Sequence, residues 1–201
     1  MPESVQPSDA ILTVPNLLTF FRLALTPVFV VVALVMDNMG AAVALALLGL
    51  VTDLVDGRIA RRFGQVSKLG IQLDPLSDRL GVAAGALVLI VKHLAPVWAV
   101  LIVIGRDALL VLVGAPVLKA RGVPIPPVTR VGKYGSFATS VAFGLFLASG
   151  IHSTVHPARV LAGLGWFFFV VGAPLYLAAG VGYVTAGLRT LKSAPGSRSD
   201  G

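Results

Sequence analysis

Four aspartates lie at a spacing that would gather their carboxylates at one site. The segment that begins at residue 53 reads DLVDGRIARRFGQVSKLGIQLDPLSD. Asp53 and Asp56 stand at positions i and i+3, and Asp74 and Asp78 at i and i+4, so each pair shares one face of a helix. The first pair would end one helix and the second pair would open the next, so a short loop could bring all four carboxylates together.

Such a cluster predicts a bound cation. Carboxylates this close repel one another, and a cation relieves that repulsion. Hard oxygen ligands with no His or Cys nearby suit Mg²⁺ or Mn²⁺, and less specifically Ca²⁺. Magnesium sites that share their coordination with substrate phosphates are typical of phosphoryl chemistry, in which two ions could stabilise both the attacking and the leaving oxygens. The alternative is a set of solvated loop acids paired with Arg58, Arg61 and Arg62.

Small residues and one arginine accompany the acids. Gly57, Ala60 and Gly70 have a missing or minimal side chain, which would let a flat base or a phosphate approach the backbone closely. Arg61 lies two turns beyond Asp53, within reach of a diphosphate that it could bind through two hydrogen bonds. The segment therefore has the residue types expected around a phosphate-bearing substrate.

The elements that position these residues are predicted to be membrane helices. Hydrophobic residues make up 56% of the 201 residues and charged residues 12%, against about 45–50% and about 25% in soluble domains. Apolar runs between Pro, Gly and charged residues predict six transmembrane helices, at approximately 17–36, 41–60, 72–92, 95–118, 131–150 and 158–187. We therefore expect an all-α, polytopic fold, with one membrane domain over 1–190 and a flexible cytoplasmic tail over 191–201.

The basic residues are divided unevenly among the predicted connections. One side collects Arg58, Arg61, Arg62, Lys68, Lys119, Arg121, Arg130, Lys133, Arg189, Lys192 and Arg198, whereas the other has Lys92 and Arg159. The positive-inside rule then places both termini and the aspartate cluster on the cytoplasmic side of the inner or plasma membrane. The net charge of +7 is therefore largely topological, and no nucleic-acid partner is expected. The segment PSDAILTVP is expected to lie along the cytoplasmic surface as a short interfacial helix.

Polar residues at the start of the first helix form a second candidate group. Asn16, Thr19 and Arg22 recur every three residues, so they share one helical face. They could contact a substrate in the membrane. The alternative is a capped helix start whose arginine extends to the cytoplasmic interface.

A third group is basic. Arg106 interrupts the fourth helix beside Asp107, and a charge inside a span is a functional candidate. Its alternative role is pairing with Asp107 or with one of the clustered acids. Arg130 and Lys133, three residues apart at the start of the fifth helix, could join Arg106 in holding an anionic group, or could anchor lipid phosphates instead.

The segment from Asp53 to Asp78 resembles the signature of the CDP-alcohol phosphatidyltransferases at every fixed position, and six transmembrane helices are that family's arrangement. Members displace CMP from a CDP-linked donor by an alcohol, using divalent metal. The resemblance implies that Asp53, Asp56 and Asp74 coordinate metal, and that Asp78 contacts metal or acts as the general base. It also implies homodimerisation and a cytidine pocket. Gly57, Ala60 and Gly70 would line that pocket, with Asp56 near the nucleotide and Arg61 on the diphosphate.

The stretch VPNLLTFFRLALTP resembles the glycerophosphate- and cardiolipin-forming branches, whose donor is CDP-diacylglycerol. The favoured acceptor is glycerol-3-phosphate, giving phosphatidylglycerophosphate and CMP. The alternative is phosphatidylglycerol, giving cardiolipin. Two departures from the glycerophosphate pattern favour the alternative, namely Ser136 and Thr139 after Gly132-Lys133, and Arg106-Asp107 where Arg-Glu is more common. A transporter or channel is the rival class, but its acids would be expected near mid-membrane on several helices.

Overall fold

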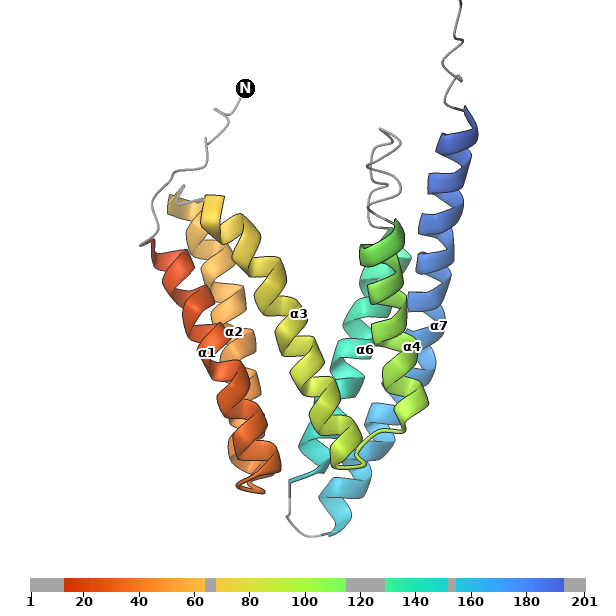
Figure 1. Cartoon of the computed structure of the whole chain (residues 1–201). Helices are drawn as coiled ribbons and strands as arrows, with labels where there is room; N and C mark the ends of the chain where they lie inside the picture. The colour runs from red at the N-terminus through yellow and green to blue at the C-terminus, as the bar shows by residue number, and fades with distance from the viewer. Residues whose placement is uncertain (1–12, 64–67, 115–128, 152–154, 194–201) are drawn as a thin grey trace, which may run out of the picture. The chain divides into compact units, whose positions relative to one another are not determined.

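The computed structural model describes residues 13–63, 68–114, 129–151 and 155–193, and within these ranges all regular structure is helical. The helices in order are α1 (Val14–Leu34), α2 (Met39–Phe63), α3 (Lys68–Val91), α4 (Val97–Leu109), the π-helical turn η1 (Leu110–Gly114), α6 (Arg130–Ser149) and α7 (Val155–Ser193), as Figure 1 shows. Each helix coincides with one predicted segment, which confirms the all-α class. Helix α7 continues three residues into the predicted tail. The predicted interfacial segment and residues 115–118 lie largely outside the described ranges.

The start of α1 is set by its own sequence. The Thr13 side chain accepts a hydrogen bond from the backbone N–H of Asn16 at 3.3 Å, which caps the first turn. A proline in that turn is compatible with a helix start, because its missing N–H would have no partner there. This cap sets the first turn of α1, in which Asn16 lies three residues before Thr19.

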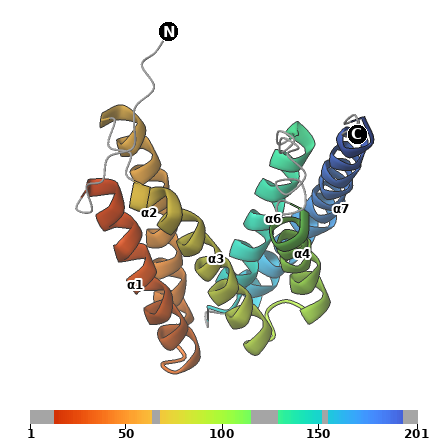
Figure 2. The same ribbon diagram turned by 45° about the horizontal axis from the view of Figure 1, so that its top comes forward.

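The chain divides into two compact units. The first comprises Met1–Leu94 with Leu147–Ala158, and its main elements are α1, α2 and α3 (Figure 2). Helix α1 packs against both α2 and α3. The core of this unit is built from two residues of each helix, Phe29, Ala33, Met39, Ala42, Ala84 and Val88. Three of the six are alanines, which allow the helix axes to approach closely.

Helices α1 and α3 run parallel and side by side. Thr19 contacts Asp74, Arg22 contacts Ser77 and Asp37 contacts Lys92, and in each pair the residues are 55 positions apart. Because all three contacts join residues with the same separation in sequence, the two helices keep one register along their length. The polar face of α1 is therefore aligned with the aspartates of α3.

The second unit comprises Ala95–Phe146 and Arg159–Gly201, with α4, η1, α6 and most of α7. Helices α6 and α7 meet through glycines. A Cβ added at Gly135 would lie 2.5 Å from the backbone nitrogen of Tyr176, and one at Gly172 would lie 2.7 Å from the Cβ of Ala138. Aromatic rings of Trp98, Phe146, Trp166 and Phe169 pack together in the same unit. Close helix contact through small residues is typical of membrane helices.

Two described segments, Asn16–Leu34 and Pro157–Ala186, are long and apolar enough to cross a bilayer, and Met39–Asp53 is a shorter apolar segment. Many large apolar side chains on these helices are exposed, including Val31, Phe167 and Val170. Exposed apolar side chains in such numbers on long apolar helices indicate contact with lipid or with other protein. No other described helix is both long and apolar enough by the same measure. The six-span arrangement stays a prediction.

Candidate active site

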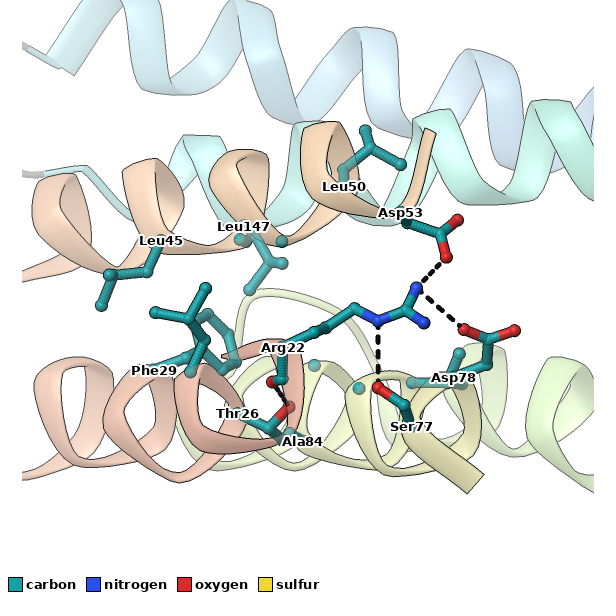
Figure 3. Close-up of a pocket in the computed structure, with 16 residues that line it drawn as sticks. Arg22, Thr26, Phe29, Leu45, Leu50, Asp53, Ser77, Asp78, Ala84 and Leu147 are labelled. Carbon is teal, nitrogen blue, oxygen red and sulfur yellow. Dashed lines mark hydrogen bonds and ion pairs between the residues drawn. The ribbon is translucent and has the colours of Figure 1, made fainter. Parts of the chain in front are cut away.

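Arg22 joins two of the predicted metal ligands. Its guanidinium nitrogen Nη1 contacts Oδ1 of Asp53 on α2 and lies 3.2 Å from Oδ1 of Asp78 on α3. Its Nε donates a hydrogen bond to the Ser77 hydroxyl at 3.0 Å. Figure 3 shows the arginine extending from α1 into the space between the other two helices. Aspartates that are 25 positions apart in the sequence therefore face one guanidinium.

The burial of these groups is unequal. The Arg22 side chain is 11% exposed, whereas those of Asp53 and Asp78 are 43% and 60% exposed. The carboxylates can thus be reached from outside while the arginine holds them from within. The Arg22 side chain is directed at the acids of α2 and α3. Whether this group of residues lies at the membrane interface stays a prediction.

Asp74 is held by the same face of α1. The Thr19 hydroxyl donates a hydrogen bond to Oδ1 of Asp74 at 2.7 Å, and both Thr19 and Asn16 are 1% exposed. The shared face that the three-residue spacing predicts is therefore present, and it is directed at α3. The cap at Thr13 is present as well, so the capped-start alternative and the inward-facing arrangement coexist.

A cavity of about 460 Å³ lies between the three helices. Its polar end is formed by Arg22, Asp53, Ser77 and Asp78, and the rest of its lining is mainly apolar. Gly49, Gly81 and Gly85 line it, and a Cβ added to any of them would meet nothing within 4 Å. Figure 3 shows Phe29 and Leu45 at the end opposite the acids. The cavity suits a molecule with a charged end and a hydrophobic body.

The remaining predicted residues of this region are located only in part. Asp56, Gly57, Ala60 and Arg61 belong to α2, but their side chains lie outside the described part of the structure. Gly70 is buried on α3. Whether Asp56 completes the set of carboxylates and whether a base fits against the small residues therefore stay predictions.

Arg106 lies in the second unit, in a cluster of its own. Its Nη1 donates to Oδ1 of Asp107 at 2.9 Å, and its guanidinium carbon lies 4.2 Å from the centre of the Tyr176 ring. The Tyr176 hydroxyl donates to the same Asp107 oxygen. Gly180 makes room for the arginine, because a Cβ there would lie 2.9 Å from Nε of Arg106. The pairing with Asp107 that the sequence allowed is present, and the Arg106 side chain is 20% exposed.

Arg130 and Lys133 lie in the first turn of α6 and are exposed. Exposed cations at this position are compatible both with an anionic ligand and with lipid phosphates, so the structure leaves the two interpretations open.

Sequence reasoning missed two residues of these clusters. Ser77 lies within the motif segment, between Asp74 and Asp78, and a polar residue one position before an acid could have been noticed. Tyr176 gave no such signal, since it is 69 positions from Asp107 and lies in an apolar run.

Comparison with known proteins identifies a family. A family model described as CDP-alcohol phosphatidyltransferase matches residues 12–177, a range that includes all four aspartates, Arg22 and the Arg106 cluster. The match covers most of the chain in both compact units.

Individual relatives are similar over most of their length. The chain is 38% identical to the cardiolipin synthase (CMP-forming) of Streptomyces coelicolor over 193 residues, which cover 92% of the chain and 87% of the relative. It is 38% identical to a putative cardiolipin synthase of Mycobacterium tuberculosis, with 96% and 91% covered. It is 30% identical to the CDP-diacylglycerol–glycerol-3-phosphate 3-phosphatidyltransferase of Bacillus subtilis, with 66% and 75% covered.

Proposed function

Because the chain belongs to the CDP-alcohol phosphatidyltransferase family, we propose that it transfers the phosphatidyl group of CDP-diacylglycerol to a hydroxyl of phosphatidylglycerol, giving cardiolipin and CMP. The observation that carries the reaction class is the meeting of Asp53 and Asp78 at the polar end of an apolar cavity. The transporter and channel alternatives are thereby set aside, since the family is one of transferases.

The reaction exchanges the phosphoanhydride bond of the donor diphosphate for a phosphate ester bond to the acceptor. The acceptor hydroxyl oxygen attacks the phosphorus that carries the diacylglycerol, and the bond from that phosphorus to the bridging diphosphate oxygen breaks. CMP leaves with the bonding electron pair, and the hydroxyl proton passes to a base. We assign the base to Asp78, whose carboxylate is 60% exposed and can be reached by a substrate. Its main contribution is to hold the hydroxyl in line with the scissile bond.

The chemistry of the clustered acids suits a divalent ion. The donor set consists of carboxylate oxygens, which Mg²⁺ and Mn²⁺ prefer, and members of this family depend on divalent metal. We propose that Asp53, Asp56, Asp74 and Asp78 hold the metal, with two ions. Bound there, metal would neutralise the diphosphate and the charge that develops on the leaving CMP. Thr19 fixes one of these carboxylates through its 2.7 Å hydrogen bond to Asp74.

The shape of the cavity supports a lipid donor. Its polar end would receive the diphosphate, while its apolar lining would accommodate part of the acyl region. The cytidine would lie against Gly57, Ala60 and Gly70, with Asp56 near the nucleotide and Arg61 on the diphosphate. Asn16, Thr19 and Arg22 would contribute from α1, as donor contacts or as supports for the carboxylates.

The choice of acceptor rests on the names of the relatives and on one position, Asp107, at which the chain departs from the glycerophosphate pattern. The two relatives named as cardiolipin synthases are 38% identical and cover more than nine-tenths of the chain. Arg106 is followed by Asp107 and not by Glu, which favours the same branch. We propose that Arg106, Arg130 and Lys133 hold the acceptor phosphate. Glycerol-3-phosphate is the second candidate acceptor, because the name of the Bacillus subtilis relative includes it. Gly132-Lys133 also matches the start of the pattern expected in the glycerophosphate branch.

We also propose that the enzyme is a multi-pass protein of the plasma membrane, with six spans, cytoplasmic termini and a cytoplasmic active site. The distribution of basic residues supports this orientation. Both substrates are lipids or lipid precursors, which a membrane-embedded cavity can receive without extraction from the bilayer. A homodimer is expected from the family alone.

The test supplies the purified full-length chain in mixed micelles with CDP-diacylglycerol, Mg²⁺ or Mn²⁺, and one acceptor at a time. The acceptors are phosphatidylglycerol, glycerol-3-phosphate and, as a control, inositol phosphate. Cardiolipin as the lipid product with phosphatidylglycerol alone is expected. Formation of phosphatidylglycerophosphate, with no product from phosphatidylglycerol, would overturn the acceptor and would leave the reaction class intact.

A further inference from the structure

Arg22 occupies a position that a metal ion would need. A single nitrogen, Nη1, contacts the carboxylate of Asp53 and lies 3.2 Å from that of Asp78. A divalent ion that bound both carboxylates would have to lie in the same gap between α2 and α3. Among the described residues, no three His, Cys, Asp or Glu side chains are arranged to hold one ion together. The guanidinium between two of the acids is consistent with that finding.

The arginine is fixed in this gap by more than its charge. Nε donates to the Ser77 hydroxyl at 3.0 Å, so two faces of the guanidinium are used at once. The Arg22 side chain is 11% exposed, whereas those of Asp53 and Asp78 are 43% and 60% exposed, so water screens the attraction only in part. A guanidinium held by a hydroxyl and two acids is a stable alternative to a bound ion.

We propose that Arg22 is the built-in counter-cation of the carboxylate site, and that a divalent ion binds Asp53 and Asp78 only after displacing its guanidinium. This inference rests on the proposed function, since it takes these two aspartates as metal ligands. Arg22 is a positioning residue in this role. It keeps the two acids facing each other in the metal-free protein, and its release is part of metal binding.

The consequence is a metal affinity that Arg22 lowers. Only the fraction of molecules with the guanidinium displaced can accept the ion, and the apparent dissociation constant rises in inverse proportion to that fraction. A cation left beside the ion would add direct repulsion in a partly buried site. Removal of the arginine should therefore tighten metal binding, whereas removal of an ordinary supporting residue should weaken it.

Three variants separate the effect of the Arg22 guanidinium from that of net charge. Arg22→Gln removes the charge. Arg22→Lys keeps the charge but cannot contact Ser77 and both acids with one rigid fork. Arg79→Gln is the matched control, because Arg79 is exposed, is next to Asp78 in the sequence and has no ion pair with a described side chain. It changes the net charge equally without touching the gap.

The experiment titrates Mn²⁺ into the full-length proteins in detergent without any substrate, with free Mn²⁺ measured by electron paramagnetic resonance. We expect Arg22→Gln to bind Mn²⁺ about tenfold more tightly than wild type, Arg22→Lys about threefold more tightly, and Arg79→Gln within about twofold. Thermal unfolding gives a second readout. Metal-free Arg22→Gln should melt below wild type, because two carboxylates face each other without a cation, and Mn²⁺ should raise its Tm more than that of wild type.

Equal or weaker Mn²⁺ binding by both Arg22 variants, with wild-type binding intact, overturns this inference and leaves the proposed function standing. The same tightening in Arg79→Gln also overturns it, because general charge would then explain the effect. If the Gln variant does not fold without metal, the Lys variant decides. Absence of Mn²⁺ binding by wild type refutes the metal assignment and this inference with it.

Discussion

Because Gly180 lies against Arg106, the substitution Gly180→Ala, which adds one methyl group, tests the proposed acceptor site. A Cβ at position 180 would lie 2.9 Å from Nε and 3.4 Å from Cγ of Arg106. Both atoms belong to a flexible side chain, so the arginine can move aside at little cost in stability. In Gly180→Ala we therefore expect a displaced guanidinium in a folded protein.

The magnitude follows from the contacts that the displacement weakens. The stacking of Arg106 on Tyr176 is worth about 0.5–2 kcal/mol, and a charge-assisted hydrogen bond from Arg106 to a phosphate about 1.5–3 kcal/mol. Partial loss of the second contact should cost about 1.4 kcal/mol, which is about tenfold in the acceptor's kcat/KM. The loss should appear in the KM for the acceptor and leave kcat nearly unchanged, since Arg106 is proposed to hold a group that does not react.

The chain provides a matched control on the same helix. Gly182 is exposed and a Cβ there would meet nothing within 4 Å, so Gly182→Ala makes the same change of residue without moving Arg106. Helix propensity changes equally in the two variants and cancels from the comparison. The assay measures product formation in mixed micelles as a function of the mole fraction of acceptor.

A double-mutant cycle completes the design. Arg106→Gln should raise the KM for the acceptor at least as much as Gly180→Ala does, and Gly180→Ala should have no further effect in the Arg106→Gln background. Equal acceptor KM values in Gly180→Ala, Gly182→Ala and wild type would refute the proposed role of Arg106. Additive effects of the two substitutions would show that Gly180 acts by another route.

Two further pairs of variants each compare a substitution that disturbs a contact with a control that does not. The first pair tests a hydrogen bond of α1, and the second tests the contact between α6 and α7. Thr19→Val removes the 2.7 Å hydrogen bond to Asp74 and should lower kcat for CMP release by about tenfold, whereas Thr185→Val, whose exposed hydroxyl bonds to its own helix, should stay within about twofold in the same assay. Gly165→Ala would bring a Cβ within 2.8 Å of an aromatic ring on α6 and should destabilise the protein by about 1–3 kcal/mol. Gly163→Ala meets nothing within 4 Å and should unfold like wild type in a thermal melt. Equal behaviour within either pair would contradict the packing described.

The parts of the fold that could be predicted are those that depend on local pattern. Apolar runs located the described helix ends to within six residues, and the three-residue spacing of Asn16, Thr19 and Arg22 predicted a shared face that the contacts of Thr19 and Arg22 support. The spacing of Asp53 and Asp78 on successive helices was enough to bring them near one site. These features survive because helix geometry converts sequence separation directly into position.

The partners of those residues could not be predicted in the same way. That Arg22 turns toward Asp53 and Asp78 depends on the parallel register of α1 and α3, which no single segment encodes. Tyr176 reaches Asp107 from 69 positions away, and the close contact that sets its place is made through Gly135 of another helix. Register and close approach are decided by packing between helices, so they become visible only in three dimensions.

The most direct test of the central claim is metal-dependent CMP release from CDP-diacylglycerol by wild type and Asp78→Asn. The control is Asp37→Asn, in the turn that follows α1, where the aspartate pairs with Lys92. We expect wild type and Asp37→Asn to release CMP with Mg²⁺, and this release to stop when a chelator removes the metal. Asp78→Asn should still bind CDP-diacylglycerol but release almost no CMP. Turnover by Asp78→Asn near the wild-type rate, or CMP release that persists with chelator, would contradict the central claim.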